Sequence, residues 1–156
     1  MKTKYLIALG AILTAQTVAA VTPPPPPPLL LEKITTPGFI APSAALSKSC
    51  VIQKSGNLVI SYNLGGLISK RTTLLKLNFP TIIATIDKAA VGPFAAGLST
   101  VDTGRTEYNA YQKQPDGSLK KIILFQQGGI SPATNLAPEA TLLRNFIDLN
   151  CGDPLL

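Results

Sequence analysis

The sequence has no histidine and no tryptophan, and it contains two cysteines in 156 residues. Without an imidazole, the usual general base of serine and cysteine hydrolases is missing, and a zinc site would lack its commonest nitrogen ligand. The eight acidic residues are spread singly, which excludes the closely spaced carboxylates of a calcium loop. No glycine-rich phosphate loop occurs either. We therefore expect no metal, no cofactor and no catalytic activity.

The sequence also lacks an apolar run that could span a membrane, which requires roughly twenty residues. The apolar stretch from Tyr5 to Ala15 follows Lys2 and Lys4 and leads into the small residues Val18 to Ala20. This order is typical of a secretory signal peptide at residues 1–20. It predicts a bacterial protein that is periplasmic or secreted, with its mature start at Val21.

Positive charge is modest and scattered. Removal of Lys2 and Lys4 with the leader leaves 12 basic against 8 acidic residues, so the net charge falls from +6 to +4. Proteins that bind nucleic acid usually cluster their basic residues and interleave them with stacking aromatic rings. Only 6% of this chain is aromatic, and the composition therefore argues against a nucleic-acid partner.

The two cysteines lie far apart, at Cys50 and Cys151. A redox motif would have the form Cys-x-x-Cys, with two residues between the cysteines, and that arrangement is absent. In an oxidising compartment an even number of cysteines favours a structural disulfide bond, whereas two buried thiols are the alternative. We expect a Cys50–Cys151 disulfide that closes most of the folded region into one loop.

The N-terminal part of the mature chain is rich in proline. Pro23 to Pro28 form an unbroken run that favours the extended polyproline helix. It suits a stiff spacer, and the alternative is a ligand for a proline-binding module. Further proline and glycine residues predict irregular chain from Leu29 to Ser49. The expected organisation is a signal peptide at 1–20, a spacer and irregular segment at 21–49, and a disulfide-clamped domain at 50–156.

The rest of the chain predicts one α+β domain with an antiparallel sheet of about five strands and two helices packed on it. Apolar spacings of three and four predict helices at 80–90 and 137–150. The turn Gln114 to Ser118 is a strong hairpin signal, because proline and glycine suit its two special positions. Strands are expected at 50–52, 58–62, 67–77, 105–113 and 119–126.

One tripeptide raises the possibility of an enzyme. Asp102-Thr103-Gly104 matches the short signature of aspartic proteases, in which two aspartates share one proton across a dimer or a duplicated chain. Arg105 follows here, and a cation at this point would oppose that arrangement. An ordinary turn before a strand is the favoured interpretation, and a homodimeric aspartic-type hydrolase that uses Asp102 is the alternative.

The best surface candidate in the sequence is the tip of the predicted hairpin, where three lysines surround an aspartate and two tyrosines lie further down the first strand. A cationic loop beside tyrosines is suited to an acidic protein or an anionic polysaccharide, although exposed lysines also simply keep a sheet soluble. We therefore expect a noncatalytic exported binding protein, of an inhibitor or envelope-accessory kind. The candidate binding residues are Lys113, Asp116, Lys120, Lys121, Tyr108 and Tyr111.

Overall fold

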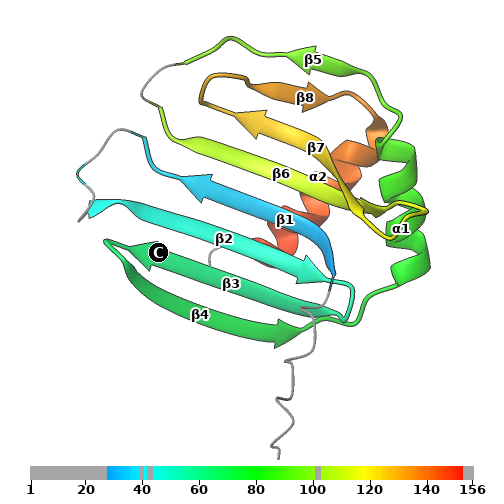
Figure 1. Ribbon diagram of the computed structural model, residues 1–156, viewed down its shortest axis with the longest axis horizontal. Helices are drawn as coiled ribbons and strands as arrows, with labels where there is room; N and C mark the ends of the chain where they lie inside the picture. Colours follow the sequence, from blue (N-terminus) through cyan, green and yellow to red (C-terminus); the bar gives the residue numbers. More distant parts are fainter. Residues whose placement is uncertain (1–27, 39–40, 42–43, 101–102, 153–156) are drawn as a thin grey trace, which may run out of the picture.

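The computed structural model describes residues 28–38, 41, 44–100 and 103–152. These residues form one antiparallel sheet of eight strands and two α-helices (Figure 1). The order across the sheet is β4-β3-β2-β1-β6-β7-β8-β5. The elements are β1 (Leu29–Thr36), β2 (Leu46–Gln53), β3 (Asn57–Leu64), β4 (Leu67–Leu74), α1 (Phe79–Ala89), β5 (Phe94–Ala96), β6 (Arg105–Lys113), β7 (Leu119–Gln127), β8 (Ala133–Asn135) and α2 (Pro138–Cys151).

The α+β class holds, but the predicted number of about five strands is wrong. Strands β1, β5 and β8 were not expected, and β2 begins four residues before Cys50. The segment 29–49 is therefore not irregular, because it contains a strand at the centre of the sheet. β1 pairs with β2 and with the distant β6. Its structure depends on partners remote in sequence, which no local pattern reveals.

Both predicted helices are present within one or two residues of their expected bounds. The side chain of Asn78 accepts a hydrogen bond from the backbone of Thr81 at the start of α1, and a proline occupies the first turn. Helix α2 buries one face, formed by Ala140, Leu143, Ile147 and Cys151. The three- and four-residue spacings of the sequence therefore located both helices.

Asn135 joins the two helices. Its side chain is buried, donates a hydrogen bond to the carbonyl of Ala89 at the end of α1 (2.8 Å), and accepts one from the backbone of Ala137 at the start of α2 (3.0 Å). One amide thereby links the two helix ends: it is a second donor to the Ala89 carbonyl, which also accepts from the backbone amide of Gly92, and it satisfies the backbone amide of Ala137.

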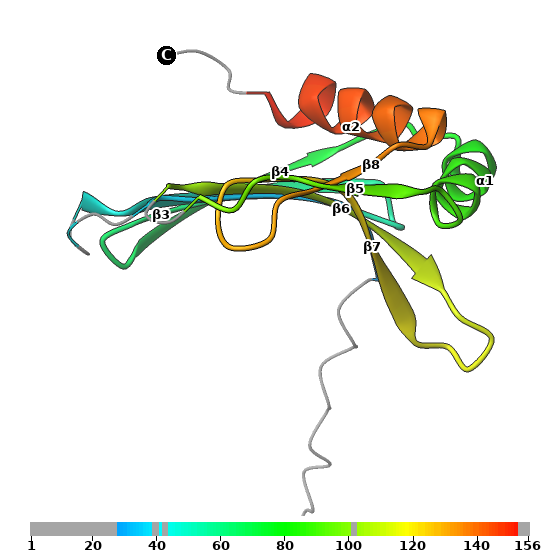
Figure 2. The same cartoon turned by 90° about the horizontal axis from the view of Figure 1, so that it is seen from above.

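The sheet is covered on one face only. Figure 2 shows α2 lying across one face, with α1 beside it at the end of the sheet, and no described helix on the other face. The β6–β7 hairpin bends away from α2 toward this uncovered face. The register between β6 and β7 shifts between Tyr108 and Asn109, and a bulge of this kind bends a hairpin.

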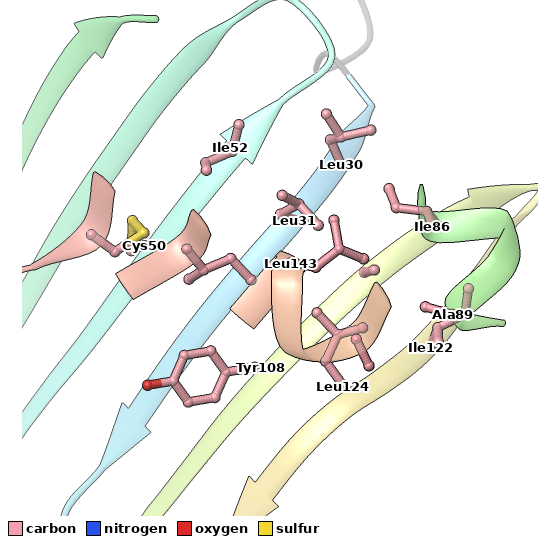
Figure 3. Close-up of a cluster of buried hydrophobic side chains, with 14 of the residues drawn as sticks. Leu30, Leu31, Cys50, Ile52, Ile86, Ala89, Tyr108, Ile122, Leu124 and Leu143 are labelled. Atoms are coloured by element: carbon pink, nitrogen blue, oxygen red, sulfur yellow. A yellow bond between two sulfur atoms is a disulfide. The ribbon is translucent and has the colours of Figure 1, made fainter. Parts of the chain in front are cut away.

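The core lies between α2, α1 and the middle of the sheet (Figure 3). Cross-strand neighbours supply it, because paired residues share a face of the sheet. Burial of this apolar surface is the main favourable contribution to folding. The most completely buried large side chains are Leu31, Ile52, Ile86, Leu124, Ile147, Asn109, Cys50 and Cys151.

The predicted disulfide is confirmed. Cys50 in β2 and Cys151 at the end of α2 are bonded, with their Cα atoms 5.8 Å apart and a sequence separation of 101 positions. Both half-cystines are buried in the core. The bond fixes the last turn of α2 to the helix-covered face of β2.

We expect loss of this bond to destabilise the protein strongly. Replacing both cysteines by alanine should lower the free energy of unfolding by about 4 to 5 kcal/mol, because a loop of this length strongly restricts the unfolded chain. Urea titration followed by circular dichroism measures the change, and the reduced wild-type protein serves as a second test of the same effect. A loss below about 1 kcal/mol would contradict the expectation.

Candidate interaction surface

Tyr108 belongs to the contact between α2 and the sheet. Its hydroxyl donates a hydrogen bond to Asp148 of α2 (2.7 Å), and Lys33 of β1 forms an ion pair with the same carboxylate (2.6 Å). The guanidinium of Arg144 lies 3.9 Å from the ring centroid of Phe125. Partial burial favours the neutral form of Asp148, but the hydrogen bonds from Lys33 and Tyr108 outweigh this effect and lower its pKa.

Tyr111 faces the opposite, uncovered side of the sheet. It donates a hydrogen bond to Glu32 of β1 (2.6 Å), to which Asn109 also donates (3.3 Å). Burial and the nearby Glu32 carboxylate both raise the pKa of the Tyr111 hydroxyl, so it remains a neutral donor. Asn109 is fully buried at the bend of β6, and its Oδ1 atom has no hydrogen-bond partner among the described residues.

Lys121 is held by an internal ion pair. Its amine lies 2.9 Å from Glu107, and Arg105 contacts the other oxygen of the same carboxylate at 2.7 Å. Glu107 is itself buried. Burial alone would raise the pKa of Glu107, but the hydrogen bond from Lys121 and the charges of both cations lower it. This cluster joins β6 to β7 on the uncovered face.

At the hairpin tip, Asp116 closes the turn. Its carboxylate accepts hydrogen bonds from the backbone amide and the hydroxyl of Ser118 at 2.9 and 2.7 Å. Lys113 and Lys120 are exposed there, and neither forms an ion pair with a described residue. The six candidate residues of the sequence analysis are therefore not brought together on one surface, and the two lysines are the only cations among them without an ion pair to a described residue.

Some sequence predictions concern residues outside the described ranges. Asp102, on which the aspartic-type hydrolase depends, is one of them. The signal peptide and Pro23 to Pro27 are others. These interpretations stay predictions.

The most exposed element of the described chain is β4, which we call the β4 edge (Leu67–Leu74). All eight of its residues are exposed. It is the outermost strand at one end of the sheet, and α2 lies over the middle (Figure 1). Leu67, Ile68 and Leu74 are 79%, 72% and 72% exposed. The opposite end of the sheet is β5, which has only three residues.

A row of leucines leads from the sheet to the β4 edge. Leu46 of β2 pairs with Leu64 of β3, which pairs with Leu67 of β4. Paired residues share a face of the sheet, and all three side chains are exposed. The β4 edge is therefore apolar where it continues this row.

The β4 edge is also cationic. No acidic residue occurs between Glu32 and Asp87, a stretch that contains six basic residues: Lys33, Lys48, Lys54, Lys70, Arg71 and Lys76. Lys33 binds Asp148, and Lys48 donates to the carbonyl of Cys151. Lys70 and Arg71, at the centre of β4, are exposed and form no ion pair with a described residue. This surface was not predicted from the sequence, although the run without acidic residues was a visible signal of it.

Two further findings on the described residues concern membranes and metal ions. Within the described residues, no helix is both long and apolar enough to cross a bilayer. No group of three or more acidic or cysteine side chains in those ranges is arranged to hold a metal ion. No protein-family model matches the sequence, and no curated protein matches it significantly. Function must therefore be inferred from the surface itself.

The Glu107 cluster makes a prediction about stability and pH. Because the pKa of Glu107 is lower in the folded protein, its contribution is present above the ordinary value of 4.5 and is lost as pH falls through the native pKa. Glu107→Gln should therefore lower the free energy of unfolding at pH 7 by about 2 kcal/mol and flatten the acid limb of the stability profile. Urea titrations between pH 2 and 7 measure both effects.

Lys113→Gln is the matched control, because this exposed lysine of the same hairpin has no ion pair with a described residue. It should change stability by less than about 0.5 kcal/mol. Equal effects of the two substitutions at pH 7 would show that the Glu107 cluster contributes no specific stability.

Proposed function

We propose that this is an exported, noncatalytic protein that binds a macromolecular partner through the β4 edge. The observation that carries the proposal is that β4 is an eight-residue end strand with every residue exposed. Long exposed edge strands are a hazard that proteins usually shorten, cover or twist away. A strand left open with exposed apolar side chains at both of its ends is explained most simply by a partner that covers it.

The disulfide supports the proposed location. Disulfide bonds persist in the periplasm and outside the cell and are rare in the cytosol of most organisms. The predicted signal peptide at residues 1–20 leads to the same compartments. A bacterial periplasmic or secreted protein is consistent with both.

The fold suits recognition. The disulfide and the Asp148 contacts anchor α2 to β1, β2 and β6, which form the middle of the sheet. The β4 edge is hydrogen-bonded to this anchored sheet through β3. A surface that is already ordered loses less conformational entropy on binding than a mobile loop does. An inhibitor or an envelope accessory factor would use such a rigid surface.

Export predicts a defined mature chain. The protein recovered from the producing bacterium should begin at Val21 and should contain no reactive thiol. Intact-mass measurement with and without iodoacetamide under denaturing conditions tests both points. A product that retains Met1 to Ala20, or that takes up two alkyl groups without prior reduction, would contradict the proposed location.

Two matched charge reversals test which surface binds. Lys70 and Arg71 on β4, and Lys113 and Lys120 on the hairpin, are two pairs of exposed cations. If the β4 edge is the site, Lys70→Glu with Arg71→Glu should lower capture of a cross-linked partner from periplasmic or medium fractions at least tenfold. The hairpin pair should leave capture unchanged.

Quantitative mass spectrometry of the cross-linked products measures the result, and thermal unfolding confirms that both variants are folded. The opposite result would locate binding at the hairpin. If the wild-type protein captures nothing above a disulfide-free, unfolded control, the proposed binding function is wrong.

A further inference from the structure

We infer that the β4 edge accepts an extended, acidic segment of a partner protein as a ninth strand of the sheet. This inference rests on the proposed function and specifies how the partner binds. Strand addition of this kind obtains affinity from main-chain hydrogen bonds and specificity from the side chains on the two faces. Three features of β4 fit such a partner: its outward backbone groups, its charges and its apolar ends.

The turn before β4 determines which backbone groups face outward. Gly65 and Gly66 form a two-residue turn with φ values of 55° and 91°, and this turn joins the paired residues Leu64 and Leu67. Such a turn closes on a pair whose backbone groups bond each other, and the bonding direction then alternates along the strand. The residues whose amide and carbonyl groups point away from β3 are therefore Ile68, Lys70, Thr72 and Leu74.

These outward groups have no neighbouring strand, because β4 pairs only with β3 among the described strands. Four alternating residues offer both a donor and an acceptor. An incoming strand of about eight residues would pair with all of them, which is a normal length for a strand. The outer side of β4 thus already presents the donors and acceptors that another strand would need for pairing.

Charge selects an acidic occupant. Lys70 pairs with Ser61, and Arg71 pairs with Ile60, so the two cations lie on opposite faces of the sheet. Opposite charges directly across two strands stabilise the pair, and like charges destabilise it. No acidic residue of this chain between positions 33 and 86 can neutralise them locally. Two adjacent acidic residues in the incoming strand would meet both cations.

The same charges disfavour a second copy of this chain. In antiparallel pairing of two β4 strands, residues with the same bonding direction lie opposite each other, so the two central registers place either Lys70 opposite Lys70 or Arg71 opposite Arg71 of the other copy. A further shift of two residues still leaves a cation of one strand diagonally across from the same cation of the other. Edge cations are a common means of preventing self-association. A different, acidic strand therefore fits this edge better than β4 itself.

The ends of β4 add an apolar requirement. Leu67 and Leu74 are exposed at the two ends, and Leu67 continues the row that begins with Leu46 and Leu64. A leucine opposite Leu67 would extend this row by one strand and remove apolar surface from water. The inferred recognition pattern is therefore apolar at both ends and acidic in the middle.

A peptide of this pattern tests the inference directly. The probe is the octapeptide Leu-Thr-Thr-Glu-Glu-Thr-Thr-Leu with blocked ends, which reads the same in either direction. Its control has lysine in place of both glutamates. Isothermal titration should show that the glutamate peptide binds at least tenfold more tightly than the lysine peptide. Amide signals of Ile68, Lys70 and Thr72 should shift in nuclear magnetic resonance spectra on binding.

Two substitutions at one position separate strand addition from simple charge attraction. Thr72→Pro removes an outward-pointing amide without removing a hydrogen bond to β3. Edge strands tolerate proline at such positions, where the lost amide faces solvent. Thr72→Val keeps the amide. We expect Thr72→Pro to weaken binding of the glutamate peptide about tenfold, as loss of a main-chain hydrogen bond and its alignment would. Thr72→Val should bind within twofold of the wild type.

Charge reversal gives an independent result. The protein with Lys70→Glu and Arg71→Glu should prefer the lysine peptide over the glutamate peptide. The side chains of Lys70, Arg71 and Thr72 are exposed, so the charge-reversal variant and the two Thr72 variants should unfold at temperatures close to that of the wild type. Equal binding by Thr72→Pro and Thr72→Val, or no binding of the glutamate peptide, would overturn strand addition.

The outcomes also separate this inference from the proposed function. If dextran sulfate displaces the peptide and binds Thr72→Pro and Thr72→Val equally well, the edge is an anionic-polysaccharide site and strand addition is wrong. If Thr72→Pro still captures the same partner as the wild-type protein, and to the same extent, then the protein binds this partner at a surface other than the backbone of β4. A dimer that Thr72→Pro abolishes in sedimentation experiments would assign β4 to a second copy of the chain.

Discussion

The docking of α2 on the sheet is the interaction on which the other surfaces depend. A covalent bond from Cys50 to Cys151 and a charged contact from Lys33 and Tyr108 to Asp148 hold the helix against β1, β2 and β6. One helix can cover only a few strands, whereas the sheet has eight. The outer strand β4 therefore stays exposed as a direct consequence of where α2 is anchored.

The two groups of cations on the sheet have different roles because only one group is paired internally. In the hairpin, Lys121 and Arg105 neutralise the buried Glu107 and help to join β6 to β7. In β4, Lys70 and Arg71 lie in a region without any acidic residue. A charge that is already matched inside the fold contributes little to recognition, whereas an unmatched charge on a rigid edge is available to a partner.

The sequence predicted well the features that depend on nearby residues. Proline and glycine positions located the hairpin turn at 114–118, and spacings of three and four located both helices. Prediction from the sequence failed for β1. This strand lies between β2 and β6, and its pairing with β6 involves residues about seventy positions away. The short strands β5 and β8 are stabilised by each other and by β7, and their three-residue length carries no periodic signal.

For the candidate site, too, some features could be predicted from the sequence and others depend on the tertiary structure. The exposure of lysines at the hairpin tip follows from a polar turn, but the separation of Tyr108 and Tyr111 onto opposite faces follows from strand alternation and from partners on α2 and β1. By itself, the sequence determined the α+β class, the helices, the hairpin turn and the cysteine pair, because spacing and residue type act locally. Only the tertiary structure decided which strand became the open edge, because that depends on the order of strands and on where one helix is anchored.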